Sequence, residues 1–304
     1  MRTSLFVRVI VPFMISVNAS AAIGNVVVTT AAGFERGLPA KGSIAAIFCT
    51  GLEGINGVIA TEATPLPREI AGVKVRVGGV GAPIFAIAAL AGYQQINIQV
   101  PQEAVIHLPT TFPSWPVGSD DAFTDVVIEQ GGQSTSAIVV VRKSPGDFFE
   151  LEGGFAVLQH ASDYSLVTSE NPARPEEMII AYLTGLPGTR PVVATGILSP
   201  VPPAIVPQIS QPQVDNYNLI ILLPPNNIAA ISPDFAGLTP GLIGVYQINF
   251  KLSDQSALFG NRPLAVFNAE FYLVRSLCTA FCGNPASHTR FSSKLVRIPI
   301  APKK

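Results

Sequence analysis

Short runs of alternating apolar and polar residues recur along the chain. In KVRVGG, residues 74–79, valines alternate with Lys74 and Arg76 before a pair of glycines. A period of two predicts a strand with one face in a core and one in water, and the glycines predict a turn. The alternation returns in INIQV, residues 96–100, where Pro101 ends the strand because proline has no N–H to donate to a neighbouring strand.

Two longer stretches predict hairpins. DVVIEQGGQSTSAIVVVRK, residues 125–143, places two apolar runs around a polar link that contains Gly-Gly. Near the C-terminus, AEFYLVR (269–275) and KLVRIPI (294–300) follow the same plan with a longer link.

Two phrases occur twice in the same order. GYQQINIQVP (92–101) returns as GVYQINFKLS (244–253), 152 positions later at the Q-I-N triplet. IFCTGL (47–52) returns as AYLTGL (181–186), 134 positions later at the T-G-L triplet. The difference of 18 predicts an insertion in the second copy, within the proline-rich stretch 200–212. Each copy is expected to open with the strand ending in T-G-L and to finish with a hairpin.

This order predicts an all-β chain of two tandem immunoglobulin-like antiparallel β-sandwiches, each of about 100 residues or more. The first domain is expected over residues 22–143 and the second over 144–304, joined near Ser144-Pro145-Gly146. Both a hinge and a rigid packing remain open at that link. The 27 prolines and 26 glycines agree with many short strands joined by tight turns.

Charge narrows the range of partners. Charged residues make up 13% of the chain and the formal net charge is −1, so the basic stripe of a nucleic-acid binder is absent. A surface of Thr, Ser, Asn, Gln and Gly is common in extracellular β proteins. The composition therefore favours export and a partner that is not recruited by bulk charge.

The N-terminus has the plan of a cleaved signal peptide over residues 1–21. Arg2 and Arg8 flank its start, an apolar stretch runs over 9–17, and Ala19-Ser20-Ala21 supplies small residues for cleavage after Ala21. A membrane anchor or a buried strand is the alternative, but the stretch is too short to span about 30 Å of hydrocarbon. No cysteine follows it to carry a lipid. The mature chain is therefore expected to be exported, to the periplasm or outside the cell, without a membrane span.

The first copy resembles an uncharacterised family of bacterial secreted immunoglobulin-like domains, the Solibacter-type C-terminal domain family, which is similar to IPT/TIG sandwiches. AAGFERGLPAKGSIAAIFCTGL, PLPREIAGVKVRVGGVGAPIF and QINIQVP carry the resemblance, and the second copy matches through NPARPEEMIIAYLTGL and LTPGLIGVYQINF. Cys49 departs from the family pattern, where glycine is expected, as does a cysteine-containing insertion in the last hairpin. The resemblance implies an extracellular, non-catalytic role.

The cysteines have structural interpretations. Cys278 and Cys282 lie four apart in the link of the final hairpin, and in an exported protein they predict a disulfide. A metal site needs more ligands than His288 nearby, and the CxxxC spacing does not favour a redox motif. Cys49 lies in an apolar strand and predicts a small buried hydrophobe rather than a nucleophile.

Other patterns for chemistry are sparse, and no cofactor is expected. His107, His160 and His288 are not spaced for zinc, and HExxH, GxSxG and P-loop patterns do not occur. GSDDAFTD brings together three carboxylates as a calcium candidate, although it lacks the oxygen spacing of an EF-hand loop. These carboxylates belong to Asp120, Asp121 and Asp125. A solvated loop is the alternative.

Trp115, with Phe112, lies on a proline-rich loop, TTFPSWPVG, and is the candidate ligand-binding segment. Exposed aromatics on such loops stack on sugars or anchor proteins, whereas aromatics folded back over the sandwich end are the alternative. Tyr93 and Tyr246 are expected in the core or at its rim.

The leading hypothesis is an exported, non-enzymatic structural or adhesive protein with a protein or glycan partner at the cell surface. The alternatives are a carbohydrate-binding module using Trp115 and a hydrolase with a scattered catalytic set.

Overall fold

The computed structural model describes residues 22–108, 121–143, 146–207, 215–223, 227–252, 267–278 and 288–301. The regular structure in these ranges is almost entirely β-strand, with a short 3-10 turn at Glu152–Gly154. The predicted all-β, immunoglobulin-like sandwich class is therefore confirmed. Within the described ranges, no helix is both long and apolar enough to cross a membrane. The predicted signal peptide, residues 1–21, lies outside the described residues.

The first sandwich consists of two sheets built from strands between Gly24 and Val140. One sheet has the order β1-β2-β8-β7-β3, and the other has the order β10-β9-β5-β4 with β6 paired to β5. The strands are β1 (Gly24–Thr30), β2 (Ile44–Thr50), β3 (Val58–Ala60), β4 (Glu69–Ile70), β5 (Val73–Val77), β6 (Val80–Gly81), β7 (Ile84–Leu90), β8 (Tyr93–Gln99), β9 (Phe123–Gln130) and β10 (Gln133–Val140).

The second sandwich is built from strands between Asp147 and Ile300. One sheet has the order β11-β15-β19-β18 with β14 on β15, and the other has the order β12-β13-β22-β20-β16-β17 with β21 on β20. The strands are β11 (Asp147–Phe148), β12 (Glu150–Leu151), β13 (Phe155–Ala156), β14 (Leu158–His160), β15 (Met178–Thr184), β16 (Asp215–Leu223), β17 (Asn227–Ile231), β18 (Phe235–Leu238), β19 (Tyr246–Lys251), β20 (Phe267–Cys278), β21 (His288–Ser292) and β22 (Val296–Ile300). Pairing is antiparallel between these strands except where β13 runs parallel to β22.

The apolar and polar residues that alternate in the sequence are alternately buried and exposed in the structure. In β5 the three valines are buried while Lys74 and Arg76 are exposed. The predicted hairpin forms from β9 and β10, joined by Gly131-Gly132. Both glycines have left-handed backbones, with φ of 57° and 83°, which is the geometry of a two-residue turn that matches the twist of its strands. Glycine adopts this geometry without a Cβ clash.

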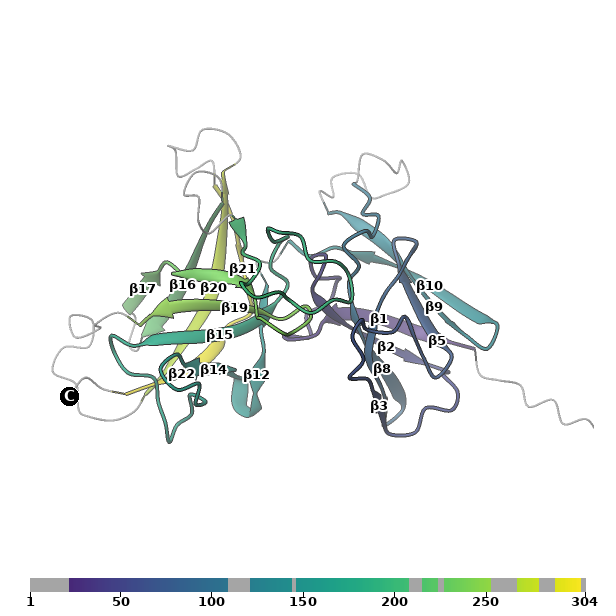
Figure 1. Cartoon of the computed structure of the whole chain (residues 1–304), viewed down its shortest axis with the longest axis horizontal. Helices are drawn as coiled ribbons and strands as arrows, with labels where there is room; N and C mark the ends of the chain where they lie inside the picture. The colour runs from purple at the N-terminus through teal and green to yellow at the C-terminus, as the bar shows by residue number, and fades with distance from the viewer. Residues whose placement is uncertain are drawn as a thin grey trace, which may run out of the picture.

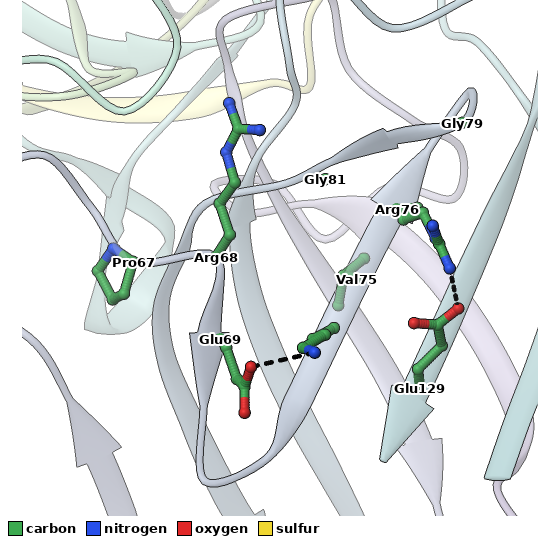
Figure 2. A pocket seen from close by; sticks show the side chains of 9 residues that line it. Pro67, Arg68, Glu69, Val75, Arg76, Gly79, Gly81 and Glu129 are labelled. Carbon is green, nitrogen blue, oxygen red and sulfur yellow. Dashed lines mark hydrogen bonds and ion pairs between the residues drawn. The ribbon is translucent and has the colours of Figure 1, made fainter. Parts of the chain in front are cut away.

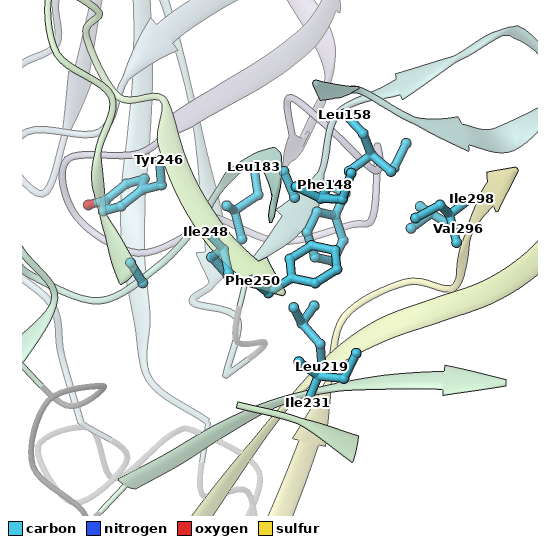
Figure 3. Packing of buried hydrophobic residues seen from close by; sticks show 14 of the residues in the cluster. Phe148, Leu158, Leu183, Leu219, Ile231, Tyr246, Ile248, Phe250, Val296 and Ile298 are labelled. Carbon is cyan, nitrogen blue, oxygen red and sulfur yellow. The ribbon is translucent and has the colours of Figure 1, made fainter. Parts of the chain in front are cut away.

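Each sandwich has its own apolar core. In the second, buried side chains from both sheets meet between them, as Figure 3 shows for Phe148, Leu183, Leu219, Phe250 and Ile298. In the first, Ile47, Ile96 and Ile128 occupy the corresponding space. Tyr246 is buried at one end of the second core, with its hydroxyl turned away from the other labelled residues (Figure 3).

One predicted detail is wrong. The strand ending in T-G-L does not open either copy, because β1 precedes and pairs with β2, and β14 precedes and pairs with β15. The predicted final hairpin does form, because β20 pairs with β22, and β21 in the link between them also pairs with β20. The proline-rich stretch in which an insertion was expected lies outside the described residues from position 208 to 212.

The two sandwiches lie next to each other along the long axis of the molecule (Figure 1) and meet at a polar seam. We define this seam by Ser43, Gln99, Thr184, Thr195 and Gly196. Thr184 Oγ1 accepts a hydrogen bond from Ile44 N at 2.9 Å and donates one to Gly244 O at 2.9 Å. Ser43 Oγ accepts from Gly185 N at 3.0 Å.

A second part of the seam involves the end of β8. Gln99 Nε2 donates to Gly42 O in its own sandwich, and Gln99 Oε1 accepts from Gly196 N of the other at 2.6 Å. Thr195 Oγ1 accepts from Gln102 N at 2.9 Å and donates to Glu103 Oε2 at 2.7 Å. Since Ser43, Gln99 and Thr184 are buried, these bonds replace water on both sides of the contact.

Candidate functional site

The segment nominated for ligand binding lies outside the described residues. Trp115, Phe112 and Asp120 all fall in positions 109–120. Of the other calcium candidates, Asp121 pairs with Lys143 at 3.2 Å, and Asp125 belongs to β9. In the described part of the chain, no three His, Cys, Asp or Glu side chains are grouped to hold a metal ion.

Of the three cysteines, Cys49 and Cys278 lie within the described residues and Cys282 does not. Cys282 lies outside the described residues and Cys278 ends β20, so the disulfide stays a prediction. Cys49 is buried in the first core, as predicted. Burial raises the pKa of its thiol to about 11, so the thiolate that a nucleophile needs is scarce at neutral pH.

His160 is held by the fold on both sides of its ring. Its Nδ1 lies 3.0 Å from Glu177 Oε2, its Nε2 lies 3.2 Å from the Asn171 carbonyl oxygen, and the side chain is buried. Histidine backed by a carboxylate supplies two of the three members of a hydrolytic triad, but here the second nitrogen faces a carbonyl rather than a serine or cysteine. His107 instead stacks on Phe123, with ring centroids 5.6 Å apart.

An open hollow of about 520 Å³ lies on the first sandwich over β4, β5 and β6. Figure 2 shows its charged side chains, most of which pair with each other. Lys74 Nζ lies 3.2 Å from Glu69 Oε2, and Arg76 pairs with Glu129. Arg68 extends away from the Glu69–Lys74 pair and has no ion pair with the described residues (Figure 2). Exposed pairs of this kind contribute little binding energy, so the hollow is a weak candidate.

The opposite sheet of the same sandwich has a different character. None of its five strands, β1, β2, β3, β7 and β8, contains a charged residue. By contrast, β4, β5 and β9 of the other sheet carry five. Charges are the usual means of keeping a sheet face soluble, so an uncharged outer face is a candidate contact surface.

Three aromatic rings gather on this face. Phe34, from the loop between β1 and β2, lies with its ring centroid 6.1 Å from that of Phe48, and Phe48 lies 5.6 Å from Tyr93. Phe34 is 54% exposed and Tyr93 is 41% exposed, so two of the three rings are available to a ligand. Phe34 also has a left-handed backbone, with φ of 53°, which is uncommon for a bulky side chain.

Amide side chains lie beside the rings. Gln95 pairs across the strands with Phe48, and its Nε2 donates to Asn97 Oδ1 at 2.8 Å. We call Phe34, Phe48, Tyr93, Gln95 and Asn97 the aromatic–amide face.

Of these residues, the sequence indicated only Tyr93, because the apolar sequence of β2 does not show that Phe48 points outward. The alternation of Ala45, Ile47 and Cys49 inward is visible only once the sheet is known.

Comparison with known proteins adds little to this picture. No protein-family model matches the chain, and neither does any curated protein. A solved structure of a chimeric titin Z1Z2 is similar at 8% identity over 94% of this chain and 100% of that one, with a TM-score of 0.17. An endo-fucoidan hydrolase of glycoside hydrolase family 107 is similar at 12% identity and a TM-score of 0.16, over 87% of this chain and 28% of the hydrolase. The resemblance to the secreted-domain family stays a prediction.

Proposed function

We propose that this protein is an exported, non-enzymatic binding protein whose two immunoglobulin-like sandwiches form a structural or adhesive module at a cell surface or in the extracellular matrix. The main observation in support of this proposal is the hydrogen-bonded seam between the sandwiches. Relative motion is the default for loosely joined domains, whereas here buried Ser43, Gln99 and Thr184 hydrogen-bond across the contact. Such a seam supports a role in which sheet faces are held in a fixed orientation.

Two further observations support a role in binding rather than turnover. Two side chains considered for chemistry serve the fold, since Cys49 lies in the core and both ring nitrogens of His160 have partners. The aromatic–amide face, in contrast, exposes apolar rings that the fold leaves uncovered. Export is expected from the N-terminal segment and from the low charge.

Retention under flow tests the proposal. Beads coated with the mature chain, residues 22–304, are passed over surfaces that carry either extracellular-matrix proteins or polysaccharides, and beads coated with heat-unfolded protein serve as the control. We expect retention of the folded protein on at least one surface without release of fragments from it. Absence of retention on all surfaces, or cleavage of the retained polymer, contradicts the proposal.

A further inference from the structure

The second sandwich repeats the strand part of the aromatic–amide face. On β2 and β8, Phe48 lies opposite Gln95 and Ala46 lies opposite Asn97. On β15 and β19, Tyr182 lies opposite Gln247 and Ile180 lies opposite Asn249. The amide pair is also repeated, because Gln247 Nε2 donates to Asn249 Oδ1 at 3.2 Å as Gln95 donates to Asn97. An outward ring beside a Gln–Asn pair therefore occurs once in each sandwich.

The loop aromatic is repeated as well. An antiparallel bridge joins Thr29 to Arg36 in the first sandwich and Gln159 to Leu166 in the second, and each closes a loop that contains one aromatic residue. These residues are Phe34 and Tyr164. Both have left-handed backbones, with φ of 53° and 59°, and both are exposed, Tyr164 to 65%. Phrase matching in the sequence missed this pair because AAGFER and ASDYSL share little beyond the ring.

The loop that carries Tyr164 is tied to the strand residue Tyr182. Gln159 Nε2 donates to the Tyr164 carbonyl oxygen at 2.7 Å, and Tyr182 Oη donates to Gln159 Oε1 at 2.5 Å. Burial raises the pKa of Tyr182, and the charge of Tyr164 acts in the same direction. Gln159 therefore links the Tyr164 loop to the Tyr182 side chain in this sandwich, whereas in the other the rings of Phe34 and Phe48 pair directly.

Folding alone does not explain these loop aromatics. A left-handed backbone favours glycine or asparagine and costs an ordinary residue about 1 kcal/mol or more. An exposed ring recovers little of that cost through burial, yet each loop keeps one. Strained residues of this kind occur at ligand-contacting positions, and here two unrelated loop sequences place one at the equivalent point of both sandwiches.

We infer that each sandwich carries a binding site for a neutral polysaccharide, with Phe34 and Tyr164 as the stacking residues. This inference rests on the proposed binding function and names its ligand. Apolar ring faces fit the C–H faces of pyranose sugars, and an amide side chain offers both a donor and an acceptor to neighbouring hydroxyls. The strands of the first face carry no charge, and of β15 and β19 in the second only β19 carries one, Lys251, which is paired with Glu176. An uncharged chain of sugars is therefore the complementary ligand.

Two sites on one chain have a measurable consequence. A polymer that reaches both sites binds the second one within the same molecule, which increases the overall affinity beyond that of either site alone. Removing one site is therefore expected to reduce the affinity in part, and removing both sites to abolish it.

Affinity electrophoresis of the mature chain tests this inference. Gels contain a soluble neutral β-glucan, mannan, xylan or galactomannan, or the polyanion alginate as a comparison. The variants are Phe34→Gly, Tyr164→Gly and the double variant, because glycine removes the ring while suiting the left-handed backbone. Ala71→Gly is the matched control, since Ala71 has φ of 49° and lies in the turn between β4 and β5, outside both proposed sites.

We expect at least one neutral polymer to retard the wild type and Ala71→Gly equally. Each single variant should weaken that binding by about tenfold, and the double variant should lose about 100-fold or all of it. Retardation by alginate alone, or wild-type binding by the double variant, overturns the inference. If no polysaccharide retards the protein but coated beads still hold to matrix proteins, the ligand is wrong and the proposed function stands. If beads fail on every surface as well, both fall.

Discussion

Gln99 and Gln95 belong to the same strand and the same face, but only Gln99 is buried in the seam. Replacing Gln99 with alanine leaves Gly196 N and Gly42 O without their partner. Because a buried unpaired polar group costs about 1–3 kcal/mol, we expect Gln99→Ala to lower the free energy of unfolding by about that amount in urea titrations. Gln95→Ala is the control and should change it by less than about 0.5 kcal/mol. Equal effects of the two variants contradict the importance of the seam.

Tyr246 should make the protein sensitive to alkali. Burial raises the pKa of its phenol to about 12, although a hydrogen bond with Ser43 opposes the shift. The folded-state pKa lies above the ordinary value of about 10, so the stabilisation is complete below pH 10 and is lost as the pH rises toward 12. By pH 11 the free energy of unfolding should fall by about 1.4 kcal/mol through this residue. Urea titrations between pH 8 and 11 should show this loss in the wild type and not in Tyr246→Phe.

Among the elements, the β9–β10 hairpin depends on the two glycines of its turn. Gly132 has φ of 83° and its missing Cβ would meet no neighbour, so backbone strain alone decides the effect of a substitution. We expect Gly132→Ala to lower the free energy of unfolding by about 1–2 kcal/mol. Gly132→Asn should cost less, because asparagine tolerates this backbone better. Equal stability of the alanine variant and the wild type would show that the turn adopts another conformation.

The strands that the sequence predicted best are those whose side chains alternate clearly in polarity. The alternating valines of β5 and the Gly131-Gly132 turn can be predicted from the neighbouring residues alone. The apolar sequence of β2, by contrast, does not show that Phe48 faces outward. The seam was beyond prediction for a different reason. Thr50 and Thr184 belong to the same T-G-L phrase, yet Thr50 accepts a hydrogen bond from Asn25 at a sheet edge while Thr184 bonds across to Ile44. Only the packing of one sandwich against the other distinguishes them.

At the scale of the whole molecule, the seam links the stability of the two sandwiches. Arg142 follows β10, and its Nη2 lies 3.8 Å from Oδ2 of Asp147 in β11, so an ion pair also joins the two sandwiches. Its Nη1 lies 3.7 Å from Glu35 Oε2 in the first sandwich. Asp147 is buried, and its Oδ1 accepts from Lys294 N at 3.4 Å. Two separate cores joined in this way are expected to unfold as one cooperative unit rather than as independent domains.

Gly244 provides the sharpest test of that coupling. A Cβ at this position would lie 2.8 Å from Ile44 Cγ1 and 3.1 Å from Gly42 O, both in the first sandwich. Gly241 has a similar left-handed backbone, with φ of 74° against 67°, but a Cβ there meets nothing within 4 Å. Alanine at either position carries similar backbone strain, but only at Gly244 must residues of the facing sandwich shift to make room for the methyl group. We expect Gly241→Ala to unfold in one shifted transition and to keep the wild-type radius of gyration in small-angle scattering. Gly244→Ala should show two calorimetric transitions and a larger radius of gyration, because the sandwiches then unfold and move independently. A single transition and an unchanged radius in Gly244→Ala would mean that the seam does not hold the two sandwiches together.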